Sequence, residues 1–211
     1  SVFGRAQFHY YKSGTGSGGM VNVPYVSSIP DSLRENGVRI EESSQKRYRE
    51  WLKENPFDAG AGWAQDPWSQ NELPVSRAMA EEAAAVSDLA LVILGRTAGE
   101  DNDNSETPGS YLLTREEESL LETVCSVFRR TAVVLNVGNI IDMKWVNRYR
   151  PQAVLYVWQG GMEGGRGAAD VLCGKVSPCG KLVDTIAADI GDYPSSAHFG
   201  DPERNFYAED I

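Results

Sequence analysis

The chain has 211 residues and a hydrophobic content of 41%, enough for one large domain or two small ones with a substantial core. Its formal net charge of −10 argues against a nucleic-acid groove, which needs clustered Lys and Arg to meet the phosphates. No apolar run of about 18 residues is present, so the sequence excludes a membrane-spanning helix. We therefore expect neither nucleic acid nor a membrane as a partner.

Three cysteines, Cys125, Cys173 and Cys179, form an odd set without zinc-like spacing, and the sequence holds two histidines. This pattern predicts reduced thiols and argues against a metal site. Reduced thiols and the lack of a visible signal peptide favour a cytoplasmic location. Because the chain starts at Ser1 rather than Met, we expect an excised segment, in which a targeting signal would not be visible.

The first third of the chain is predicted to carry short elements around two loops. One loop, residues 13–19, is rich in glycine and serine, and the other, residues 55–75, is long and rich in Gly, Pro and Trp. Long irregular loops in compact domains tend to be functional or to contact another domain. The predicted elements are a polar-aromatic strand within 1–23, a helix over 25–36, a short strand at 38–40 and a helix over 45–54.

From residue 75 onward, apolar strands alternate with helices. Thr114 and Glu117 have the spacing of a capping box, which predicts a helix start. The predicted elements are a helix over 75–85, a strand at 89–94, a helix over 114–128, a strand at 131–136, a helical turn at 143–149, a strand at 153–158, a helix ending at 172 and an irregular tail over 175–211. This alternation predicts one α/β domain over residues 1–211, a doubly wound, mostly parallel sheet of five or six strands with helices on both faces.

The segments 89–94, 131–136 and 153–158 are near-continuous apolar runs, so each is predicted to be a central parallel strand buried on both faces. Their carboxyl ends should share one edge of the sheet, where open α/β sheets bind their ligands. We therefore expect Glu100, Gly138 and Gln159 at that edge.

Glu100 lies in the glycine-flanked loop 95–103, just after the strand at 89–94. A carboxyl group at such a place is a candidate proton donor, provided that desolvation or a nearby carboxylate raises its pKa towards neutrality. The alternative is one of several acidic residues in a solvated loop. Asp101, Asp103 and Glu106 are the competing candidates.

The residues Gly14 to Gly19 match G-x-G-x-x-G, and Glu41 follows about 20 residues later, as in a dinucleotide fingerprint. That function needs a helix to begin at the glycines, whereas residues 21–24 intervene here. The other interpretation is a flexible loop that allows close backbone approach and offers the Ser17 hydroxyl. In loop 55–75, Trp63 and Trp68 are predicted to anchor the loop rather than to stack on a sugar ring.

Several segments occur together in the order of one known family. They are FG at 3–4, GTGSG at 14–18, GRTAGEDND at 95–103, LNVG at 135–138, VWQGGMEGG at 157–165, ADVLCG at 169–174, PCGKL at 178–182 and YAEDI at 207–211. Jointly they make essentially the whole chain resemble the α/β-sandwich domain of glycoside hydrolase family 3, the β-glucosidase family. Cys179 replaces a serine usual in relatives, and no arginine follows Glu100 as in many of them.

The resemblance implies a domain of a retaining β-glucosidase that releases terminal non-reducing glucose from β-glucosides or oligosaccharides. Glu100 then matches the acid/base carboxylate, and Ser17 matches a glycine-loop serine near the sugar. A barrel domain, to which nothing in this sequence is similar, would supply the aspartate nucleophile, so the isolated chain should be inactive. No metal or organic cofactor is implied. Two alternatives remain, a non-catalytic carbohydrate-binding module and a nucleotide-binding flavodoxin-like domain.

Overall fold

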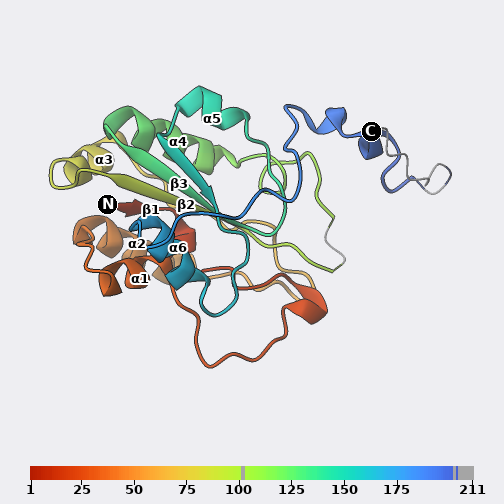
Figure 1. Cartoon of the computed structure of the whole chain (residues 1–211), viewed down its shortest axis with the longest axis horizontal. Helices are drawn as coiled ribbons and strands as arrows, with labels where there is room; N and C mark the ends of the chain where they lie inside the picture. The colour runs from red at the N-terminus through yellow and green to blue at the C-terminus, as the bar shows by residue number, and fades with distance from the viewer. Residues whose placement is uncertain (101–102, 202, 204–211) are drawn as a thin grey trace.

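The computed structural model describes residues 1–100, 103–201 and 203, and in them four strands form one parallel sheet (Figure 1). Their spatial order follows the chain, β1 (Val2–Phe3), β2 (Ala90–Arg96), β3 (Thr131–Val137) and β4 (Ala153–Tyr156). In register, Val92 of β2 lies opposite Val133 of β3, which lies opposite Val154 of β4. Because all strands are parallel, the loops that follow them leave from the same carboxyl edge.

Helices cover both faces of this sheet, as predicted. One face packs against α3 (Arg77–Ala84), α4 (Arg115–Val127) and α5 (Lys144–Tyr149), and the other against α1 (Ile29–Glu35) and α6 (Gly164–Leu172). The remaining helix, α2 (Glu42–Glu54), lies beside β1 and inserts Tyr48 into the first core. In the described part of the chain, no helix is long and apolar enough to cross a membrane.

The central strands β2 and β3 are buried on both faces, which confirms the prediction from their apolar runs. Val92 and Leu94 point into one core, while Leu91 and Ile93 point into the other. The prediction for 153–158 is wrong in part, because β4 ends at Tyr156 and lies at the edge of the described sheet with Ala153 exposed. The described sheet also has four strands rather than five or six.

Local signals explain where other elements differ from the prediction. The Ser28 side chain accepts a hydrogen bond from the Asp31 amide, so α1 begins at Ile29 and not at residue 25. No strand forms at 38–40, because the Val38 amide donates to Leu33 O (2.9 Å) and closes the end of α1 instead. The capping box of Thr114 and Glu117 is confirmed. The motif at 207–211 lies outside the described residues.

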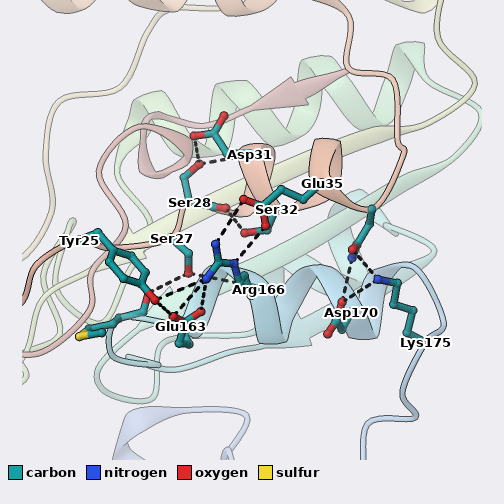
Figure 2. Close-up of polar contacts among 12 residues, drawn as sticks. Tyr25, Ser27, Ser28, Asp31, Ser32, Glu35, Glu163, Arg166, Asp170 and Lys175 are labelled. Atoms are coloured by element: carbon teal, nitrogen blue, oxygen red, sulfur yellow. Dashed lines mark hydrogen bonds and ion pairs between the residues drawn. The ribbon is translucent and has the colours of Figure 1, made fainter.

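The segment that precedes α1 is fastened to α6. Figure 2 shows Arg166 of α6 between three partners, Glu163, Glu35 and the Tyr25 hydroxyl. The Ser27 hydroxyl donates to Met162 O (2.8 Å) in the same place. These contacts fix the far end of the glycine-rich segment, so its loop is held at both ends beside the carboxyl edge of the sheet.

Candidate functional site at the carboxyl edge of the sheet

The loop that carries Glu100 pairs with the glycine-rich loop from the start of the chain. The Thr15 amide donates to Ala98 O (2.7 Å), and Thr15 forms an isolated parallel bridge with Gly99. The backbone of Gly99 has φ +148°, and a Cβ there would lie 2.5 Å from Thr15 O. Only glycine permits this close approach, so the residue before Glu100 fixes where the two loops meet.

Ser17 contacts the Glu100 carboxylate directly. Its amide (2.9 Å) and its hydroxyl (2.8 Å) both donate to Glu100 Oε2, from the 3-10 turn Gly16–Gly18. Ser17 and Glu100, the two predicted site residues, are therefore in contact although they lie 83 positions apart in the sequence. The backbone and hydroxyl hydrogen bonds of Ser17 lower the pKa of Glu100, which is exposed. Within this domain the carboxylate is therefore stabilised in its charged form.

The predicted meeting of three loops at one edge is also confirmed. Gly138, just after β3, is so close to its neighbours that a Cβ would lie 2.5 Å from Ala98 Cβ and 2.7 Å from Gln159 Nε2. The loops after β2, β3 and β4 therefore converge where Glu100 is presented. This arrangement matches the place at which α/β sheets bind ligands.

Two buried polar side chains that hold this edge were missed by sequence reasoning. Arg96, the last residue of β2, is 1% exposed and binds both carboxylate oxygens of Glu117, and its guanidinium also donates to Ser110 O (3.3 Å) and Leu112 O (3.4 Å). It thereby joins both ends of the loop that carries Glu100. The only signal was a charged residue shortly after an apolar run, a pattern that an exposed loop residue also gives.

Asn136 in β3 is the second missed residue. It is fully buried, and its side chain accepts from the Tyr11 amide (2.8 Å) and donates to Tyr11 O (3.0 Å) and Trp158 O (2.7 Å). The glycine loop and the loop after β4 are thus both attached to the end of β3. The motif at 135–138 contains this residue, but no sequence pattern indicated its partners.

The competing acids are placed differently. Asp101 lies outside the described residues, and Asp103 and Glu106 are exposed. Glu106 lines a cavity of about 890 Å³ between the edge and the segment 183–199, together with Trp158 and Phe199. Among the described residues, no group of three or more His, Cys, Asp or Glu side chains is arranged to hold a metal ion.

The two tryptophans of loop 55–75 and the glycine motif have different outcomes in the structure. Trp68 is half-buried, and its backbone carbonyl accepts a hydrogen bond from the Thr97 amide (2.9 Å), which joins the loop to the end of β2; the anchoring role of its side chain stays a prediction. Trp63 departs from that prediction, since it is 52% exposed. The glycine motif itself contains the 3-10 turn Gly16–Gly18, and α1 begins only at Ile29, so the helix N-terminus that a dinucleotide site requires does not follow the glycines.

Fold and site define an α/β domain that presents one carboxylate, held by a serine, at the carboxyl edge of a parallel sheet. Residues 1–211 match the glycosyl hydrolase family 3 C-terminal domain. The chain therefore belongs to glycoside hydrolase family 3, as the C-terminal domain of that family.

Its relatives are β-glucosidases. The chain is 54% identical over 210 residues to the beta-glucosidase of Ruminococcus albus, covering 100% of this chain and 22% of that protein. The crystal structure of a beta-glucosidase from Paenibacillus barengoltzii superposes with a TM-score of 0.95 at 55% identity, covering 100% of this chain and 23% of the other. For beta-glucosidase 3B from Thermotoga neapolitana in complex with glucose, the TM-score is 0.84 at 30% identity, with coverages of 97% and 29%. This chain thus spans less than a third of the length of each.

Proposed function

We propose that this domain supplies the acid/base carboxylate, Glu100, to a retaining β-glucosidase that cleaves terminal non-reducing β-D-glucosyl residues. The observation that carries the proposal is the placement of Glu100, exposed at the carboxyl edge and held by two hydrogen bonds from Ser17. A barrel domain outside this chain is the proposed source of the nucleophilic aspartate. The names of the relatives and the short share of their length that this chain covers support this division.

The proposed reaction is a double displacement. Glu100 gives its proton to the glycosidic oxygen while the aspartate attacks the anomeric carbon, so the leaving sugar departs as an alcohol and a glycosyl-enzyme ester forms. Glu100, now a carboxylate, then takes a proton from water, which attacks the same carbon and releases glucose. Ser17 favours the charged form of Glu100 and so assists the second step, in which the carboxylate acts as a base.

A carbohydrate-binding module without catalysis is the second candidate. It would account for a sugar site at this edge but not for a loop carboxylate, Glu100, held by two donors from Ser17. The two functions separate experimentally, because a binding module retains its sugar affinity in a Glu100→Ala variant and contributes nothing to turnover.

The test uses the β-glucosidase that contains this domain. Glu100→Ala should slow substrates with poor leaving groups, such as cellobiose, far more than dinitrophenyl glucoside, because an activated phenolate departs without protonation. Added azide should restore turnover of the activated substrate and yield glucosyl azide, since azide attacks the glycosyl-enzyme without needing a base. Asp103→Ala and Glu106→Ala are the matched controls and should show neither effect. If Glu100→Ala is benign and a control variant gives this pattern, the assignment is wrong.

A further inference from the structure

Three buried polar atoms belong to side chains that line one small cavity. They are Arg5 Nε, His9 Nδ1 and the Tyr11 hydroxyl, and none of them has a hydrogen-bonding partner in the part of the chain that the structure describes. Arg5 is 4% exposed and Tyr11 is 9% exposed. Buried polar groups are nearly always paired in folded proteins, so three such atoms around one cavity call for a shared partner.

The cavity lies where four segments of the chain meet. Its wall combines the start of the chain with loop 55–75, the end of β2 and the first turn of α4, through residues that include Tyr11, Gln70, Gly95 and Glu117. Neither Ser17 nor Glu100 is part of the wall, so this place is distinct from the candidate site at the carboxyl edge. The cavity measures about 20 Å³. A single buried water needs about 10–15 Å³, whereas pockets for organic ligands begin at roughly 300 Å³.

Gly95 explains how Tyr11 comes to line this cavity. A Cβ on Gly95 would lie 2.6 Å from Tyr11 Cε2 and 2.9 Å from Ala6 Cβ, so only glycine lets the tyrosine ring rest on the backbone of β2. The Asn136 side chain holds the Tyr11 backbone through its amide (2.8 Å) and its carbonyl (3.0 Å). The Tyr11 hydroxyl is therefore built into the fold and does not turn out to solvent.

The charges in the wall define what the shared partner must be. Arg5 Nε carries a hydrogen and can only donate, whereas a tyrosine hydroxyl donates or accepts. Burial and the nearby Arg5 charge lower the pKa of His9, so its ring is uncharged at neutral pH. A cation in the cavity would face the Arg5 guanidinium, and an anion would face the Glu117 carboxylate. The partner must therefore be a small uncharged molecule that both donates and accepts.

We propose that this cavity is the binding site of one ordered water, which joins Arg5 Nε, the Tyr11 hydroxyl and His9 Nδ1. The water accepts from Arg5 and has one acceptor and two donors left for the other two groups, whichever nitrogen of His9 carries the proton. Three hydrogen bonds are the usual number for a buried water. This inference goes beyond the proposed function and does not depend on it.

The water completes a connection between the two loops at the start of the chain. The Arg5 guanidinium donates to Asn55 O (2.8 Å) and to Asn71 O (3.0 Å), so it ties the two ends of loop 55–75 together. Tyr11 directly precedes the glycine-rich loop and is attached to the end of β3 by Asn136. A water shared by Arg5 and Tyr11 thus fastens loop 55–75 to the base of the glycine-rich loop.

The first test is a crystal structure of the β-glucosidase that contains this domain, at a resolution that shows single waters. We expect one water peak at hydrogen-bond distance, about 2.7–3.2 Å, from all three atoms. Crystals soaked in bromide should show no anomalous peak in the cavity. A bromide peak would make this an anion site, and a cavity without density would mean that the three atoms share no partner; either result overturns the proposal.

The second test compares Tyr11→Phe with Tyr149→Phe in the same enzyme, by hydrogen exchange of the backbone amides of residues 5–11. Both changes remove a buried hydroxyl that has no partner among the described residues, but Tyr149 does not line this cavity. Tyr11→Phe breaks a hydrogen bond to the water, so these amides should exchange roughly fivefold faster. Tyr149→Phe should leave their exchange unchanged.

The direction of the change in Tyr11→Phe decides the question. If the hydroxyl had no partner, its removal would relieve an unpaired buried group, and exchange would be unchanged or slower. That result, or equally fast exchange in both variants, contradicts the proposal. If Tyr11→Phe does not fold, the crystal structure of the unchanged enzyme decides alone.

Discussion

Gly16 is the position at which the structure ties the glycine loop most directly to the proposed acid/base group. Its φ is +73°, and a Cβ there would lie 2.5 Å from Glu100 Cβ and 2.8 Å from Glu100 Oε2. Gly18, in the same 3-10 turn, has no atom within 4 Å of its Cβ position. The pair Gly16→Ala and Gly18→Ala therefore adds the same methyl group to one turn, once against Glu100 and once into open space.

The size of the effect follows from these distances. Ordinary contact begins at 3.4 Å, so Gly16→Ala must move Glu100 or the loop by about 0.9 Å, the difference between 3.4 and 2.5 Å. A displacement of about 1 Å at a catalytic group costs on the order of 100-fold in rate. The left-handed backbone adds a stability cost of about 1–2 kcal/mol for alanine.

The assay is kcat/KM on cellobiose and on dinitrophenyl glucoside, with the free energy of unfolding measured in parallel. We expect Gly16→Ala to lose about 100-fold on cellobiose and much less on the activated substrate, because only the former needs the proton. Gly18→Ala should stay close to the parent enzyme in activity. Cellobiose turnover within threefold of the parent in Gly16→Ala, or equal losses in both variants, would refute the reasoning.

Three further outcomes are expected. Ser17→Ala removes one of the donors that lower the pKa of Glu100, so the alkaline limb of the kcat/KM–pH profile, which reports the protonated acid, should move to higher pH; an unmoved limb contradicts the assigned contact. Burial raises the pKa of Glu72 to about 7 from 4.5, so its contribution to the free energy of unfolding is complete below pH 4.5 and is lost as pH rises to about 7. Glu72→Gln should remove up to about 3 kcal/mol of this pH dependence of the free energy of unfolding, measured by urea titration at several pH values, and an unchanged pH dependence would contradict it. Arg96→Met leaves Glu117 buried without its cation and should cost about 3–5 kcal/mol in the free energy of unfolding, most of it recovered when Glu117 is also replaced by leucine; a cost below about 1 kcal/mol would show that the pair is not the main fastening of the loop.

The parts of the fold that sequence reasoning predicted are those with a strong local signal. The runs that became β2 and β3 are almost entirely apolar, because both of their faces are covered by helices. The start of α4 followed from the spacing of Thr114 and Glu117. The strand at β4 was predicted, but its place at the edge of the described sheet was not, because an apolar run does not say how many neighbouring strands a strand has.

The position of the site could be predicted from the sequence, but the buried residues that hold its loops in place could not. Glu100 and Ser17 were each identified by motif, and the structure adds the hydrogen bonds that join them. The buried Arg96 and Asn136 hold the same loops through partners 21 and 125 residues away. Such partners depend on how the strands are ordered in the sheet, which single-residue patterns do not encode.

Under the proposed function, the electrostatics of Glu100 indicate what the nucleophile-bearing domain should contribute. A general acid needs a pKa near the working pH, whereas Ser17 lowers the pKa of Glu100 in this domain. A carboxylate nucleophile brought close to Glu100 raises that pKa by like-charge repulsion, and its esterification in the glycosyl-enzyme removes the repulsion again. We therefore expect Glu100 to be protonated when it must act as an acid and charged when it must act as a base. In this account, the hydrogen bonds from Ser17 keep the pKa of Glu100 low, and the nearby nucleophilic carboxylate raises it only until that carboxylate is esterified in the glycosyl-enzyme.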